Sequence, residues 1–181
     1  MEKLYDVGAE RAVLAGLLQH GMDAYVTVSD IISTEAFGNA NNQAIYRCIE
    51  KCIAQDQKVD IAALLAAAQH LELSEAINTD QELKYINSLY DFPISPENVL
   101  SFAAQIKKFE FARKIKRLVN KVSKDVDSVS GTETIDEIIQ ILENPVTDFL
   151  REDDGGERPE LIGNSIEDYI NFLVENKCDI I

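Results

Sequence analysis

Apolar residues recur along most of the chain three or four positions apart, which is the spacing of one helix face. Asp6 is a suitable N-cap for the first predicted helix, and Gly21 is a suitable stop. The elements that we predict next are a helix over 24–32, a turn at 34–37, a helix capped by Asn41 or Asn42, a helix over 61–70 capped by Asp60, and a helix opened by a Thr79–Glu82 capping box.

A much longer helix is predicted after Ser95-Pro96-Glu97, which combines a cap, a proline in the first turn and an acid at the positive helix end. Gly131 breaks this helix, and a Thr134–Glu137 capping box opens another. Two helices joined by so short a turn pack antiparallel, as a helical hairpin. The apolar seam of the long helix is Val99, Phe102, Ile106, Phe109, Ala112, Ile115, Val119, Val122, Val126 and Val129.

The second hairpin helix contains Pro145, which should kink or restart it with Asn144 as a new cap. Residues 151–164 are charged and contain glycine, as expected of an exposed linker, and Ser165 can cap a last short helix. Because the chain ends on two isoleucines, we expect the natural protein to continue.

These patterns predict an all-α protein. Its expected parts are a globular helical subdomain at 1–94, a long antiparallel helical hairpin at 95–142, and a linker region with a short helix at 143–181. The composition agrees, since Gly (8) and Pro (4) are scarce in the 181 residues and helix-forming residues dominate.

The net charge of −15 makes most of the surface repel a phosphate backbone. Eight of the 17 bases nevertheless lie in one 18-residue stretch of the long helix, residues 107–124. Weak nucleic-acid contact is one interpretation, but few aromatic residues are available there for stacking. Pairing with acidic segments of a neighbouring subunit or partner is the other. The eight bases are Lys107, Lys108, Arg113, Lys114, Lys116, Arg117, Lys121 and Lys124.

Residues suited to catalysis or metal binding are sparse. The sequence has no Gly-x-x-x-x-Gly-Lys-Ser/Thr phosphate loop. Cys48 and Cys52 are one helical turn apart, but buried small side chains explain them better than a zinc site, which needs four ligands. His20 and His70 lie near helix ends without a partner for catalysis. We therefore expect no catalytic, cofactor-binding or metal site here, and a cytoplasmic protein without a membrane span.

Four segments resemble the N-terminal domain of the DnaB family of replicative helicases. They are AERAVLAGLL (9–18), FGNANNQAIYRCI (37–49), KVDIAALLAAA (58–68) and ELKYINSLYDFPISPENVLSFAAQI (82–106), in the family's order and near its spacing. Gln81-Glu82 stands where the family usually has Gly-Gly. Such departures are typical of a divergent member, and we expect a bacterial protein that a phage could encode.

This resemblance implies a non-catalytic collar and linker. Hairpins of two subunits would pair, three pairs would form a hexamer, and primase or a helicase loader would dock on the collar. ATP, Mg²⁺ and DNA would bind only the motor domain of the longer protein, an ATP-dependent DNA helicase. The self-association candidates are Phe102, Ile106, Phe109, Phe111, Ile115 and Val119, and the partner-docking candidates are Tyr85, Arg113, Lys116, Arg117 and Val122.

Other interpretations stay open. The subdomain could itself cover both faces of the seam, although an exposed apolar face usually marks an interface. The chain could also be a stand-alone adaptor or inhibitor that binds a helicase. An enzyme with an unrecognised site predicts turnover, and a DNA-binding regulator predicts salt-dependent DNA affinity.

Overall fold

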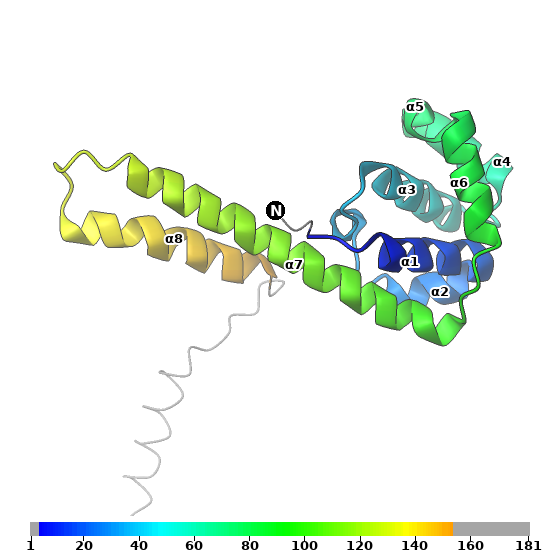
Figure 1. The fold of residues 1–181 in the computed structure, drawn as a ribbon, viewed down its shortest axis with the longest axis horizontal. Coiled ribbons are helices and arrows are strands. Elements are labelled where there is room, and N and C mark those ends of the chain that lie inside the picture. The colour runs from blue at the N-terminus through cyan, green and yellow to red at the C-terminus, as the bar shows by residue number, and fades with distance from the viewer. Residues whose placement is uncertain (1–3, 154–181) are drawn as a thin grey trace, which may run out of the picture. The chain divides into compact units, whose positions relative to one another are not determined.

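The computed structural model describes residues 4–153, shown as a ribbon in Figure 1. These residues form α-helices and one 3-10 turn and no strand, which confirms the predicted all-α class. The elements are α1 (Val7–His20), α2 (Met22–Val28), η1 (Thr34–Ala36), α3 (Ala40–Ala54), α4 (Ile61–His70), α5 (Ser74–Ile77), α6 (Asp80–Tyr90), α7 (Pro96–Asp127) and α8 (Ile135–Asp153). The linker and last helix predicted beyond residue 153 lie outside the described range.

The chain divides into two compact units, the first ending at Ile115 and the second beginning at Lys116. The boundary lies inside α7, whereas the sequence pattern predicts a boundary at the start of this helix, between residues 94 and 95. The reason is burial: Val99, Ala103 and Ile106 on the first half of α7 belong to the core of the first unit.

Helix α1 runs through the core of the first unit and contacts α2, α3 and α6. Val13, Leu14 and Leu17 are completely buried. The carboxylate of Asp6 accepts a hydrogen bond from the amide of Ala9, and Gly21 ends the helix with φ 57°, so both predicted ends are confirmed.

The cap of α3 differs from the prediction. Asn39, not Asn41 or Asn42, is the N-cap, and its side-chain oxygen accepts from both of their amides. Only Asn39 has the extended backbone that an N-cap needs. The helix then buries Tyr46 against Phe37, with ring centroids 5.0 Å apart.

The N-caps of α4 and α6 are the residues that the sequence predicted. Asp60 accepts from the amide of Ala63 at the start of α4, and Thr79 accepts from the amide of Glu82 at the start of α6. Helix α2 ends at Val28, earlier than the predicted residue 32. The single-turn helix α5 was not predicted, because four residues are too few to show a periodic pattern.

Helix α8 continues through Pro145, so the predicted restart at Asn144 is wrong. Proline removes one backbone hydrogen bond, but the helix keeps an apolar face because Ile141, Pro145 and Phe149 are all half-buried. The hairpin helix therefore reaches Asp153 and includes residues that we assigned to the linker region.

Cys48 and Cys52 are free thiols buried in the core, as predicted for small core side chains. Within residues 4–153, no group of three or more His, Cys, Asp and Glu is arranged to hold a metal ion. None of the helices in that range is both long and apolar enough to cross a membrane.

Candidate functional site

The second unit is a helical hairpin made of the last part of α7 and of α8, which run antiparallel in Figure 1. The connecting turn is held by side chains. Gly131 has φ 90°, a conformation that favours glycine. Thr134 and Glu137 form the predicted capping box: the amide of Thr134 donates to the Glu137 carboxylate (2.7 Å), and the amide of Glu137 donates to the Thr134 hydroxyl (3.2 Å).

Glu133 fastens the other side of the turn. Its carboxylate accepts hydrogen bonds from the amide and hydroxyl of Ser130 and from the amide of Gly131, at 2.9–3.3 Å. Its own backbone amide, followed by the donors of Ser130 and Gly131, lowers the pKa of Glu133 to about 2. The turn is therefore a defined structure that ends in a fixed negative charge.

Apolar side chains of the hairpin are left in solvent. Between residues 111 and 151 every side chain is half-buried or exposed, and none is buried. Ile135 is 77% exposed, Val119 58% and Leu142 54%. We call the exposed apolar residues of this unit the outer stripe, which comprises Val119, Val126, Ile135, Ile139, Leu142 and Leu150.

The two halves of the outer stripe share one face. The half-buried residues show which side of each helix faces the other helix. They are Leu118 and Val122 on α7, and Ile138 and Ile141 on α8. On each helix, the outer-stripe residues are displaced around the helix axis from the residues that face the other helix. Viewed from the N-terminus of the helix, the direction of this displacement is the same for α7 and α8. Because the helices run antiparallel, that common rotation brings both halves of the outer stripe to the same side of the hairpin.

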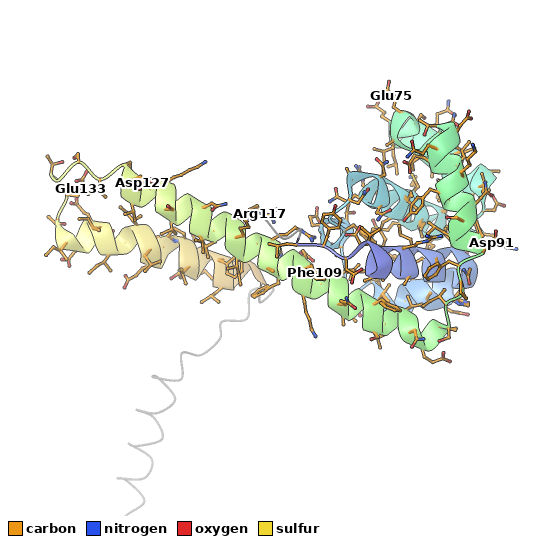
Figure 2. All side chains as sticks on the ribbon, viewed as in Figure 1. Glu75, Asp91, Phe109, Arg117, Asp127 and Glu133 are labelled. Atoms are coloured by element: carbon orange, nitrogen blue, oxygen red, sulfur yellow. The ribbon has the colours of Figure 1, made fainter. Side chains whose placement is uncertain are left out.

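Charges in the hairpin are segregated along its length. Residues 116–124 contain four bases and no acid, and residues 125–137 contain five acids and no base. We call the first set the basic band (Lys116, Arg117, Lys121 and Lys124) and the second the acidic tip (Asp125, Asp127, Glu133, Asp136 and Glu137). Figure 2 labels Arg117 in the band, Asp127 at the end of α7 and Glu133 in the turn, near the start of α8.

The basic band makes no ion pair with any acid in residues 4–153. Two neighbouring bases pair locally, since Lys107 and Lys114 both bind the buried carboxylate of Glu110, each at 3.1 Å. On α8, Arg151 pairs with Asp148 at 3.8 Å. The basic band is therefore available to a partner.

The predicted self-association residues have different surroundings. Ile106 is 1% exposed and belongs to the core, so we remove it from the set, whereas Phe102 is half-buried and packs against the core. The reason is that the first half of α7 is covered by the subdomain. Phe109 is half-buried, whereas Phe111, Ile115 and Val119 are exposed.

The predicted docking residues also differ in their contacts and exposure. Arg113 donates to the backbone carbonyls of Leu4, Glu35 and Ala36 at 2.6–2.8 Å, so its guanidinium fastens segments of the first unit together. Lys116 and Val122 are half-buried on the hairpin, and Arg117 is exposed.

Tyr85 belongs to a polar cluster where α1, α3 and α6 meet. The buried carboxylate of Glu10 accepts from the amide of Gly38 and from the side chain of Asn42, each at 2.7 Å. The Tyr85 hydroxyl donates to the Asn42 oxygen (3.1 Å), and Tyr85 lines an open cleft of about 220 Å³. Burial raises the pKa of Tyr85, so the hydroxyl stays protonated.

The sequence predicts an apolar face of this helix that carries Ile135, Ile138 and Leu142, but it does not separate the outer stripe from the residues that face α7. Ile135, Ile139, Leu142 and Leu150 recur in steps of three, four and eight, which is one helix face.

The fold and the exposed hairpin define an all-helical domain with a face suited to association. A family model described as DnaB-like helicase N terminal domain matches residues 2–108. Since this match covers more than half of the chain, the chain belongs to that family and has the role of a helicase N-terminal domain.

A solved structure agrees on the fold. The crystal structure of the N-terminal domain of DnaB helicase from Mycobacterium tuberculosis superposes with a TM-score of 0.68 at 18% sequence identity. The alignment covers 81% of this chain and 99% of that chain, so the likeness extends into the hairpin, beyond the family match. The comparison with curated proteins finds no match.

Proposed function

We propose that the chain pairs helicase subunits through the outer stripe and offers a docking surface to primase or a helicase loader. Three such pairs would form a hexameric collar, as expected of this family. ATP and Mg²⁺ would act on a motor domain outside these 181 residues, because the sequence contains no Gly-Lys-Ser/Thr phosphate loop.

The exposure of the outer stripe is the observation that carries this proposal. Two helices alone cannot enclose a core, and the hairpin indeed has no buried side chain between residues 111 and 151. Contiguous exposed apolar surface of this kind usually marks an interface. Covering it with a second hairpin would give four helices around a shared core.

Leu142→Asp tests the pairing. Leu142 is half-exposed in the hairpin, so the aspartate should leave the helices intact but place a charge in the interface. We expect the 181-residue chain to form a dimer or larger assembly by sedimentation velocity, and the variant to sediment as a monomer. Gln140→Asp, an exposed polar position of the same helix, is the matched control and should associate like the parent. A parent chain that is monomeric at millimolar concentration would refute the proposal.

Docking is tested separately by native mass spectrometry of the chain with its cognate primase. Lys116 and Arg117 lie on the hairpin without an acid partner in the described range, and Tyr85 lies at an open cleft. We expect a complex whose affinity falls when Lys116 and Arg117 are both replaced by glutamate. An unchanged affinity would exclude these residues from the docking surface.

A further inference from the structure

We infer that the hairpin carries a binding site for the phosphodiester backbone of a single nucleic-acid strand, formed by Arg117, Lys121 and Lys124 of α7. We call these three residues the cationic row. The inference goes beyond the proposed pairing and docking and depends on neither of them. It rests on the place of these side chains around the helix, on their lack of ion pairs within residues 4–153, and on the polar character of their side of α7.

The cationic row lies on one side of α7. Its members are four and three residues apart, which is the spacing of one helix face, and Figure 2 labels the first of them, Arg117. Each member is two residues from Val119 or Val126 of the outer stripe, and two residues correspond to about 200° around a helix. The row is therefore opposite the outer stripe on α7, and all three side chains are exposed. A partner that covers the outer stripe leaves the row accessible.

No acid pairs with the cationic row in the part of the chain that the structure describes. From residue 111 to residue 124, α7 contains six bases and no acid. Two of these bases have partners, since Arg113 binds backbone carbonyls and Lys114 pairs with Glu110. Asp125, the first residue of the acidic tip, is one turn beyond Lys121, so the row ends where the acids begin.

The length of the cationic row suits a short stretch of one strand. Arg117 and Lys124 are seven residues apart, which is about 10 Å along the helix at about 1.5 Å per residue. A DNA strand carries a phosphate about every 3.4 Å along its axis, so the row spans roughly three phosphates, one for each base. Asn120 is exposed, three residues after Arg117 and four before Lys124, and its amide can donate to a phosphate oxygen.

The side of α7 that carries the row is polar, which argues against a protein ligand. Between residues 116 and 128 the exposed large apolar side chains are Val119 and Val126, and both belong to the outer stripe. A protein interface normally has an apolar core inside a polar rim, whereas an interface with nucleic acid is more polar and more positively charged. No aromatic residue occurs between residues 112 and 148, so nucleobases would not stack there and binding should be independent of sequence.

A single strand fits this surface better than a duplex. The chain has a net charge of −15 and the acidic tip directly follows the row, so a wide, stiff duplex would bring further phosphates toward acids. A single strand can follow the row and bend away from the tip. The chain also belongs to a helicase family, and a helicase produces single strands.

Fluorescence anisotropy of a labelled oligothymidylate with the full 181-residue chain tests the site. We expect binding at low ionic strength that weakens steeply with salt, because phosphate contacts release counterions. Lys121→Gln combined with Lys124→Gln should weaken binding about tenfold. The same change should reduce the slope of log affinity against log salt by about 1.4, from about 0.7 for each lost contact. Arg117 stays in place, because its replacement also tests docking.

Lys58→Gln combined with Lys84→Gln is the matched control. Both lysines are exposed in the first unit, so this variant has the same net charge as the first one and keeps the cationic row. It should bind the oligothymidylate like the parent chain. Equal losses in the two double variants would mean that only the overall charge matters, and would overturn the inference.

Three further results would overturn it. They are no binding at low salt, a duplex bound as tightly as the single strand, and displacement of the probe by polyglutamate as effectively as by unlabelled oligothymidylate. The last result would assign the row to an acidic protein segment. None of them bears on pairing through the outer stripe, which Leu142→Asp tests, so the inference and the proposed function fail separately.

Discussion

Gly16 on α1 and Val99 on α7 approach so closely that a Cβ on Gly16 would lie 2.3 Å from a methyl carbon of Val99. Two non-bonded carbon atoms do not come this close, so the glycine is required for α7 to pack on α1 in this way. This contact is part of what holds the first half of the long helix to the core of the first unit.

Gly16→Ala should therefore destabilise the first unit by about 1–3 kcal/mol, the usual effect of overpacking a core. Urea unfolding followed by circular dichroism measures the loss. Val99→Ala in the same chain removes the obstructing methyl groups, so the double variant should lose less than the sum of the two single variants. Additive losses would show that the two residues do not interact.

Glu10→Gln should also destabilise the first unit. Both oxygens of the Glu10 carboxylate accept hydrogen bonds, from Gly38 and Asn42, and the side chain is 1% exposed. The amide nitrogen of glutamine would have to face one of these donors, leaving a buried hydrogen bond unmade at a cost of about 1–3 kcal/mol. Glu72→Gln, at an exposed polar position of the same unit, should be neutral in the same unfolding assay. Equal stability of the two variants would contradict the hydrogen-bonding role of Glu10.

The turn of the hairpin should respond to acid through Glu133. Its pKa in the folded chain is about 2, below the ordinary value of 4.5, because its own backbone amide and the donors of Ser130 bind the ionised form. The ionised carboxylate therefore stabilises the turn above pH 4.5, and this contribution is lost as the pH falls from 4.5 toward 2. NMR titration of the Glu133 side chain should give a midpoint near the lower value, and Ser130→Ala should raise it. A midpoint at 4.5 in the parent chain would mean that the turn is not formed in solution.

Equal substitutions at two positions of the predicted seam should have opposite consequences. Ile106→Asp places an unpaired charge in the core and should unfold the first unit, since this costs several kcal/mol. Val119→Asp lies at an exposed position of the outer stripe and should keep the fold while lowering self-association. Thermal unfolding and light scattering separate the two effects. The division of the seam would be wrong if Val119→Asp unfolded the chain as thoroughly as Ile106→Asp.

Local signals in the sequence predicted helix ends well. The caps at Asp6, Asp60 and Thr134 depend on residues within one turn, so they are visible in a few neighbouring letters. Asn39 was missed because three asparagines lie within four positions and only the backbone decides which of them stands outside the helix.

Long-range packing was less predictable. The seam on α7 is one uninterrupted pattern, but its first part is core and its later part is exposed, and periodicity alone does not tell which part of a stripe is covered. The role of Arg113 was also invisible, since its acceptors are carbonyls up to 109 positions away in the chain. Pro145 was overweighted, because a single lost hydrogen bond did not end α8.

The buried thiols of Cys48 and Cys52 can report on how often the core of the first unit opens. Burial raises the pKa of Cys48 to about 11 and also raises that of Cys52, so an alkylating reagent should modify them only when the helices around them open. With Cys178 replaced by serine, the rate of labelling would measure how often that opening occurs. The same labelling rate, measured on associated and on dissociated chains, would show whether association through the hairpin slows the opening of the core of the first unit.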